Sequence, residues 1–222
     1  MNIVIINGSP RKNGSTAYIL HNLEKNLKQE GANVSYYDLC DKTIAPCKGC
    51  CVCYKTGKCI MNDDAEKISH DISMADGVII GSSTIASNVT GVLKTFIDRG
   101  HFVIEQLLKE KYALCVATYE NYGGKDTKNV LKKLLTYSGA YLSGAITIKL
   151  PFNSEYSKNS SLNIATKKYA NKLYNDIKYK HNYTFQKLKH RAIFEFGIKP
   201  FVIKKGNQYY GVQKRWSEIG LN

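Results

Sequence analysis

The chain has 222 residues, 43% of them hydrophobic, and a formal net charge of +14, which is typical of one domain with a sizeable core and at most a short appended segment. No hydrophobic run approaches the roughly 18 residues that cross a membrane. The first residues, MNIVII, enter a hydrophobic run without a basic flank or a small-residue cleavage site, so we expect a strand rather than a signal peptide, and a cytoplasmic protein.

Hydrophobic runs of strand length alternate with amphipathic stretches over the first 180 residues. In chain order this pattern predicts a strand at 3–7, a helix at 15–31, a strand at 33–39, a helix at 63–74, a strand at 77–81, a helix at 90–100, a strand at 112–118, a helix at 127–138, a strand at 144–150 and a helix at 161–180. Short strands that are hydrophobic throughout indicate an α/β fold with a parallel sheet covered on both faces. Five of them fit a flavodoxin-like doubly wound sheet with the strand order 2-1-3-4-5.

Residues 181–222 lie outside this predicted domain of residues 1–180. We expect a C-terminal extension that packs rather than a disordered tail, because the segment carries several aromatic anchors: Phe194, Phe196, Phe201, Tyr209, Tyr210 and Trp216.

The C-terminal third is also strongly basic. Residues 151–222 contain fourteen Lys and Arg but only four Asp and Glu. A solvated lysine-rich surface is the simplest interpretation, and an acidic protein such as ferredoxin is the most economical partner. Binding of nucleic acid or of an acidic membrane is a different hypothesis. We disfavour it because no nucleic-acid motif is present and the aromatic residues do not alternate regularly with the lysines.

The loop after the first strand reads NGSPRKNGST, residues 7–16. It is not a Walker A loop, because no Lys directly precedes Ser15 and Thr16, and it lacks the GxGxxG spacing of dinucleotide folds. Its hydroxyls, Arg11 and the amides that begin the next helix meet at one end of the sheet, which predicts a site for a monophosphate. A Ser or Thr helix cap in a Pro-Gly turn is the alternative.

Three stretches, GSPRKNGST, CKGCCVCYKTGKCIMNDD and GVLKTFIDR, together resemble the flavodoxin-fold NAD(P)H-dependent FMN reductases and iron-sulfur flavoproteins. The resemblance covers about residues 1 to 150. It implies FMN as cofactor, NAD(P)H as a possible electron donor and a homodimer or higher homo-oligomer with flavin sites near the interface. It also implies that the FMN phosphate is bound by Ser9, Arg11, Asn13, Ser15 and Thr16.

The loop after the third strand, GSSTIASNVTGVLK, departs from this family. A Ser-Pro-x-Tyr stretch usually supports the flavin ring there, but Ser83 replaces the Pro and Ile85 replaces the aromatic residue. We expect the backbone amides of Thr84, Ile85 and Ala86 to hydrogen bond the ring edge instead.

The loop after the fourth strand, TYENYGGKD, begins at Thr118. Tyr119 or Tyr122 is a candidate to stack where the family's aromatic residue is missing. Gly123 and Gly124 would allow a close approach to the ring.

Cys47, Cys50, Cys53 and Cys59 follow the pattern C-x2-C-x2-C-x5-C. Thiolates this close repel one another unless a metal or cluster neutralises them, and compact spacing of this kind wraps iron-sulfur clusters. The resemblance implies a [4Fe-4S] cluster on these four residues, with Cys51 as an extra cysteine. A metal-free thiol loop or redox dithiol is the main alternative, while zinc or a disulfide is disfavoured by the spacing and by a reducing compartment.

The remaining cysteines, Cys40 and Cys115, fall in or beside strands. We expect both to be buried there and to pack as small hydrophobic residues. Lys48, Lys55 and Lys58 lie among the thiols and favour negative charge there.

The favoured function is an FMN-dependent oxidoreductase or electron-transfer flavoprotein. It would pass electrons from NAD(P)H or a ferredoxin-like donor through FMN, with a [4Fe-4S] cluster, to a small acceptor. A cluster-free NAD(P)H:FMN, quinone or nitro-type reductase is the alternative. No catalytic side-chain constellation is predicted, and we expect His101 and Glu105 on a solvated helix face. The cysteine loop should lie near the flavin edge, because it follows strand two, which lies beside strand one.

Overall fold

The computed structural model describes residues 1–151 and 160–221. Its sheet has five parallel strands in the order β2-β1-β3-β4-β5. The strands are β1 (Asn2–Asn7), β2 (Asn33–Asp38), β3 (Gly77–Ser83), β4 (Tyr112–Tyr119) and β5 (Tyr141–Lys149). The predicted flavodoxin-like order is confirmed, and each predicted strand is present with ends shifted by three residues at most.

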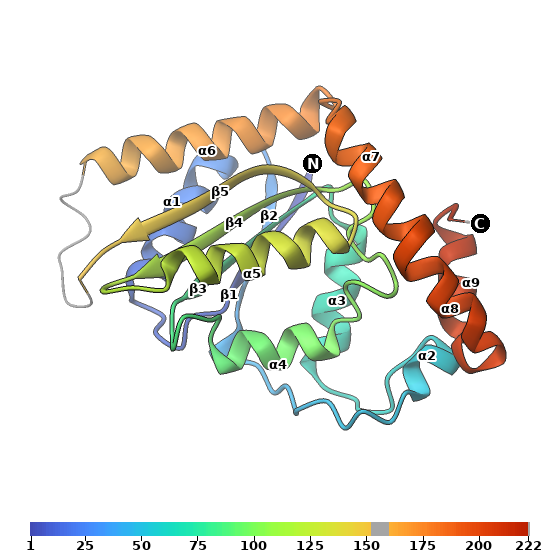
Figure 1. The fold of residues 1–222 in the computed structure, drawn as a ribbon. Helices are drawn as coiled ribbons and strands as arrows, with labels where there is room; N and C mark the ends of the chain where they lie inside the picture. Colours follow the sequence, from blue (N-terminus) through green and yellow to red (C-terminus); the bar gives the residue numbers. More distant parts are fainter. Residues whose placement is uncertain (152–159, 222) are drawn as a thin grey trace.

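Helices cover both faces of the sheet (Figure 1). On one face lie α1 (Ser15–Gln29) and α6 (Ser160–Lys178), which share a hydrophobic core with the strands. The other face is covered by α3 (Asp64–Met74), α4 (Gly91–Arg99) and α5 (Gly124–Tyr137). The segment between β2 and α3 contains a 3₁₀ turn, η1 (Leu39–Asp41), and the five-residue helix α2 (Val52–Thr56).

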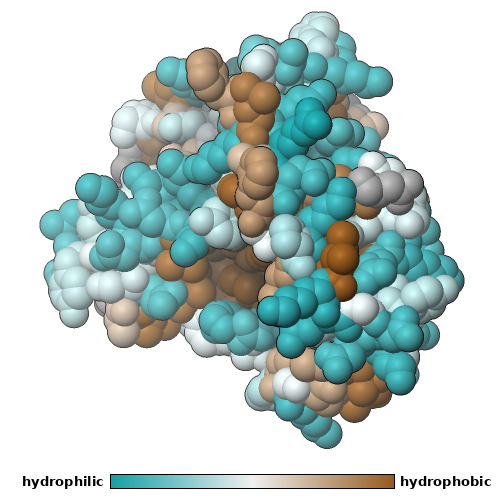
Figure 2. Space-filling model, turned by 45° about the vertical axis from the view of Figure 1, so that its right-hand side comes forward, coloured by the Kyte–Doolittle hydropathy of each residue, from teal (hydrophilic) through white to brown (hydrophobic). Residues whose placement is uncertain are grey.

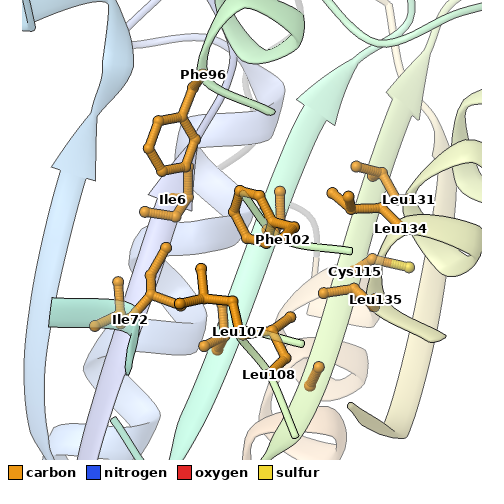
Figure 3. Packing of buried hydrophobic residues seen from close by; sticks show 14 of the residues in the cluster. Ile6, Ile72, Phe96, Phe102, Leu107, Leu108, Cys115, Leu131, Leu134 and Leu135 are labelled. Carbon is orange, nitrogen blue, oxygen red and sulfur yellow. The ribbon is translucent and has the colours of Figure 1, made fainter. Parts of the chain in front are cut away.

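The core on the α3–α4–α5 face fixes the chain at the end of α4 (Figure 3). Phe96 in α4 and Phe102 just after it pack edge to face, with ring centroids 5.6 Å apart. A methyl group on Gly100, between them, would lie 2.3 Å from the Phe102 ring. The backbone around Arg99 and His101 is therefore held between two buried aromatic rings.

The two cysteines outside the cysteine loop differ. Cys115 is fully buried in the core (Figure 3), and burial raises the pKa of its thiol to about 12, as expected for a small hydrophobic residue. The expectation that Cys40 is buried is wrong. It lies half-buried in the turn η1, just beyond the end of β2, where Leu39 rather than Cys40 is buried in the core.

The C-terminal extension is helical and packs on the domain. It comprises α7 (Thr184–Ile193), a π-helical turn η3 (Phe194–Ile198), α8 (Lys199–Lys205), a 3₁₀ turn η4 (Gly206–Tyr209) and α9 (Tyr210–Glu218). Gln186 of α7 pairs with the backbone of Leu142 on the edge strand β5, at 2.7 and 3.2 Å.

The rest of the extension folds around a small core of its own, made by Phe194, Ile198, Val202, Tyr209, Val212 and Trp216.

The molecular face seen in Figure 2 is mostly hydrophilic, with hydrophobic atoms in separate patches. Among the described residues, none of the helices has the length and hydrophobicity to cross a membrane.

Candidate functional site

Three loops meet at the carboxyl ends of β1, β3 and β4 and bind one another. The amide of Gly8 donates to the carbonyl of Gly81 at 2.8 Å, and that of Thr84 donates to the carbonyl of Thr118 at 2.8 Å. The buried hydroxyls of Thr16 and Thr118 share a hydrogen bond of 2.7 Å. This edge is where open parallel sheets bind ligands, and these hydrogen bonds organise it without a ligand.

The first loop leaves the start of α1 open to an anion. Gly14, at the N-cap, has no side chain that could cap the helix. Ser15 and Thr16 are buried at the start of the helix, whereas Arg11 and Asn13 are exposed. Uncapped amides beside hydroxyls form the kind of site that binds phosphate, so these residues fit a monophosphate.

Ser9 shapes the same loop from inside. Its amide donates to Asn7 Oδ1 at 3.0 Å, and its hydroxyl accepts the amide of Arg11 at 3.2 Å. Ser9 is 2% exposed, so its hydroxyl already serves the turn that carries Arg11.

In the second loop, most of the backbone amides that we expected to bond the flavin ring form hydrogen bonds within the chain. The amide of Ile85 donates to the carbonyl of Asn88 at 3.0 Å, and the Asn88 amide donates back. The Thr84 amide is also bonded within the chain, as described above, so two of the three amides expected to face the flavin ring have internal partners. Ala86 lies at the tip with a positive φ of 48°, and the Ile85 side chain is 53% exposed.

The glycines of the third loop permit contacts between the loops themselves. A methyl group on Gly123, at φ +80°, would lie 2.6 Å from Ser87 Oγ, and one on Gly124 would lie 2.2 Å from the Tyr119 ring. The Tyr119 ring thus packs closely on Gly124 at the start of α5, whereas Tyr122 is 74% exposed. Of the two predicted stacking residues, Tyr119 has the defined position.

The helix α4 connects this edge to the cysteine loop, residues 46–60. At its N-terminal end, Thr90 caps the helix by accepting the Leu93 amide at 3.2 Å and donates its hydroxyl to the carbonyl of Gly8. At its C-terminal end, Arg99 binds both ends of the cysteine loop.

The guanidinium of Arg99 binds the Asp63 carboxylate through both terminal nitrogens, at 2.7 and 3.0 Å, and donates to the carbonyl of Ala45 at 2.8 Å. Asp63 in turn caps α3 through the Ala65 amide and accepts the Ala45 amide, both at 3.1 Å. The Arg99 and Asp63 side chains are only 1% and 8% exposed. This buried pair therefore closes the cysteine loop on either side.

The charges of this pair respond to their surroundings. Burial would raise the pKa of Asp63, but Arg99 and the two amides outweigh it and hold the pKa below its ordinary value. Burial would lower the pKa of Arg99, but Asp63 and the neighbouring Cys59 raise it. A fixed positive charge therefore lies beside the Cys59 thiol.

His101 provides a second cation at the same loop, and sequence reasoning missed it. The residue does not lie on a solvated helix face, because its side chain is 15% exposed and its Nδ1 is 2.6 Å from Glu105 Oε1. Burial opposes the charged form, but hydrogen bonds with Cys53 and Glu105 raise the pKa of His101 to about 10. Two cations thus face two of the predicted ligands, Cys53 and Cys59.

All seven cysteines are free, which disagrees with a disulfide framework. The five in the cysteine loop line one small cavity of about 50 Å³ together with Arg99 and His101. Within residues 1–151 and 160–221, no three His, Cys, Asp or Glu side chains are arranged to share a metal ion. The donor set fits a cluster, since the thiols and the balancing cations are present. The arrangement does not, so metal binding would have to draw the loop together.

The cysteine loop and the flavin-type loops lie at opposite ends of α4 (Figure 1). Nine residues form α4, which gives a length of roughly 13 Å. The cysteine loop is therefore separated by the length of this helix from the loops expected to hold the flavin, and its nearness to the flavin edge stays a prediction. Beyond η1 the chain runs past α4 to reach α2, rather than staying beside β1.

A larger cavity of about 320 Å³ opens beside Cys59, lined by Arg99, His101, residues of α3 and residues of α9. Several charged residues line it, including Glu66 and Arg215.

A doubly wound parallel sheet with a phosphate-type loop after its first strand defines the flavodoxin-like class of flavin-binding proteins. Residues 1–153 match the model of the NADPH-dependent FMN reductase family, and the chain belongs to this family. The chain is 37% identical over 233 aligned positions to an iron-sulfur flavoprotein of Clostridioides difficile (strain 630), with 100% of both chains covered.

Two solved structures share the fold. The structure of RosB with a bound 8-demethyl-8-formylriboflavin-5'-phosphate has a TM-score of 0.67 at 11% identity, covering 86% of this chain and 85% of that one. A flavodoxin of Streptococcus pneumoniae has a TM-score of 0.54 at 12% identity, covering 79% and 99%. The protein is thus a flavin-dependent oxidoreductase, and FMN is its cofactor.

Proposed function

We propose that this oxidoreductase is an electron-transfer flavoprotein that holds FMN at the three loops and a [4Fe-4S] cluster on Cys47, Cys50, Cys53 and Cys59. Electrons would come from NAD(P)H or a ferredoxin-like carrier and leave to a small acceptor. One observation carries the cluster part of the proposal: five free cysteines surround one cavity beside two buried cations. The two cations offset the negative charge of thiolates in that position, and thiolates are the ligands of iron-sulfur clusters.

For FMN, we propose that the phosphate is bound at the start of α1. Ser15 and Thr16 would offer hydroxyls and amides, Arg11 would offer a charge, and Ser9 would hold the turn. The ring would lie across the second and third loops. The residues proposed there are Ser83, Thr84, Ile85, Ala86, Thr118, Tyr119, Gly123 and Gly124.

FMN supplies the redox chemistry when bound, since its ring exchanges a hydride with a nicotinamide or single electrons with a metal centre. The chain contributes binding and orientation. Tyr119 is the residue that we propose covers the ring, because its own ring packs closely on Gly124 at the start of α5. The Ala86 amide is the one in the second loop proposed to bond the ring edge, since those of Thr84 and Ile85 are engaged.

The sharpest test compares two adjacent, exposed cysteines. Protein should be purified without oxygen from iron-supplied cells and analysed for iron, acid-labile sulfide, flavin and the visible spectrum. We expect about four iron atoms per chain in the wild type and a loss of most of them in Cys50→Ser. Cys51→Ser is the matched control and should keep its iron.

Two results would overturn the cluster. One is a flavin-loaded wild type that contains no iron, which would leave the cluster-free NAD(P)H:FMN, quinone or nitro-type reductase. The other is equal iron loss in both serine variants, which would remove the special role of the four-cysteine spacing.

We also propose two partners. An acidic carrier of the ferredoxin type would suit the basic C-terminal third, and its binding should weaken as salt is raised. A second copy of the chain would suit the exposed hydrophobic side chains of the extension: Phe185, Leu188 and Phe196, which are 88%, 60% and 87% exposed. Light scattering of the purified protein measures the second proposal, and a monomer at all concentrations would refute it.

A further inference from the structure

The cysteine loop has little to hold its second half in place. The helix α2, which carries Cys53, has only five residues and none of them is buried. A helix this short is not stable by itself in water. Gly57, which ends α2, adopts a left-handed conformation with φ 76°. The position of Cys53 and Cys59 must therefore come from contacts with the rest of the chain.

The C-terminal extension makes these contacts. Tyr54, next to Cys53, stacks on Tyr209 with ring centroids 4.7 Å apart and planes inclined by 22°. Tyr54 also packs against the hydrophobic core of the extension, whose central residues include Val212 and Trp216. Stacked aromatic rings stabilise a contact by more than the burial of their surface area alone provides.

The backbones touch as well. A methyl group on Gly211, at the start of α9, would lie 2.1 Å from the amide nitrogen of Gly57 and 2.8 Å from the carbonyl carbon of Thr56. The turn between Cys53 and Cys59 therefore rests directly on the backbone of α9. No residue larger than glycine fits at position 211 without moving one of the two segments.

The extension is attached, at the same time, to the segment that carries the two cations. The indole nitrogen of Trp216 donates to the carbonyl of Ile104 at 2.9 Å, and Lys109 Nζ donates to the carbonyl of Ile219 at 2.7 Å. Ile104 lies three residues after His101. The extension thus contacts α2 and also contacts the segment that directly follows Arg99 and His101 in the sequence.

We propose that the C-terminal extension is a structural part of the cluster site, in which Tyr209 and Gly211 are positioning residues. They hold α2 so that Cys53 faces His101 and Cys59 faces Arg99, and the cysteine loop retains its cluster only while α9 supports it. This inference rests on the cluster in the proposed function, but the positioning itself is a property of the metal-free chain.

Two pairs of variants test it. Gly211→Ala places a methyl group into the contact with Gly57, and its control is Gly197→Ala, where a methyl group meets nothing within 4 Å. Tyr209→Leu removes the stack on Tyr54, and its control is Tyr210→Leu, since Tyr210 is 60% exposed whereas Tyr209 is 9% exposed. All four changes lie in the extension, outside the proposed FMN loops.

The first measurement uses metal-free protein. Alkylation by iodoacetamide is followed at each cysteine by mass spectrometry. Cys53 and Cys59 should react on the order of tenfold faster in Gly211→Ala and Tyr209→Leu than in the two controls, because local opening of α2 becomes easier. Cys115, fully buried in the core, reports global unfolding and should stay protected in every variant.

The second measurement uses anaerobically purified holoprotein with a chelator. Iron and cluster absorbance should decay faster in Gly211→Ala and Tyr209→Leu than in the controls, with FMN content unchanged. Equal alkylation rates of Cys53 and Cys59 in all variants would overturn the positioning role, whether or not the wild type contains iron. Faster alkylation with equal iron retention would overturn the link to the cluster. A wild type without iron would instead overturn the cluster itself, and the alkylation rates would still decide whether the extension positions the loop.

Discussion

At the N-terminal end of α4 the three loops of the proposed FMN site bind one another through buried hydrogen bonds, such as the one between Thr16 and Thr118. At the C-terminal end the cysteine loop has no buried residue in its helix α2, and it contacts Arg99, His101 and the extension. The first region is organised before a ligand arrives, whereas the second has its donors near one cavity but not yet around a common point. A phosphate can bind to a preformed set of amides, while a cluster contributes its own bonds to the ordering of a loop.

We expect the largest effect at the C-terminal end of α4, where Arg99 holds the cysteine loop. Arg99→Met leaves the Asp63 carboxylate buried without its partner, and loss of one member of a buried pair costs about 3–5 kcal/mol. We expect a drop of that size in the free energy of unfolding, measured by urea denaturation. Lys94→Met is the control, because Lys94 and Asp98 form an exposed pair that contributes at most about 0.5 kcal/mol. Equal losses in the two variants would mean that the buried pair does not hold the loop.

A smaller effect should break the FMN side alone. Thr16→Val removes the hydrogen bond to Thr118, whose hydroxyl is then left buried, at a cost of about 1–3 kcal/mol. We expect weaker FMN binding by fluorescence titration and unchanged alkylation of Cys53 and Cys59 in the metal-free chain.

The control for this change is Thr136→Val in α5, which makes the same substitution far along that helix from its FMN-side start. If Thr16→Val also changes the alkylation rates, the two ends of α4 are not independent. The preformed loops and the cysteine loop would then not be separate regions.

The FMN side was predictable in outline because its signals are local. Each strand is a continuous hydrophobic run, and each loop follows its strand directly, so Ser9, Ser15 and Thr16 could be located from the sequence. The roles of the amides could not. Whether Ile85 faces a ligand or bonds Asn88 depends on a tight turn with Ala86 and Ser87 at positive φ, and neither residue type signals that conformation.

The cysteine side was predictable only in its thiols. Arg99 and His101 lie some forty residues further along the chain, and only the packing of Phe96 and Phe102 brings them to the loop. The extension was expected to pack from its aromatic residues, but its partner Tyr54 lies more than 150 positions away in sequence. The left-handed Gly57 and the crowded Gly211 are the local signs of that contact, and a glycine alone does not identify its neighbour.

The smallest expected effect concerns the support of the extension on the domain. His190 of α7 stacks on Tyr141 of β5, with ring centroids 5.5 Å apart. Its Nε2 is buried and has no hydrogen-bond partner among the described residues. Burial, with a smaller contribution from Lys189, lowers the pKa of His190 to about 4. The unfolded chain, with an ordinary His pKa near 6.5, therefore binds more protons than the folded chain between about pH 6.5 and pH 4.

Stability from His190 is thus fully present above about pH 6.5 and is lost as the pH falls toward 4. We expect the urea midpoint of the wild type to fall more over this window than that of His190→Gln, with a modest difference because the ring is only partly buried. His70→Gln, a change at an exposed residue of α3, is the control and should follow the wild type. Iron retention should depend on pH through His190, because α7 continues into the helices that support α2. FMN retention should show no such dependence. An equal His190 dependence of both cofactors would show that the extension acts through β5 on the whole sheet, and that its effect is not confined to the cysteine loop.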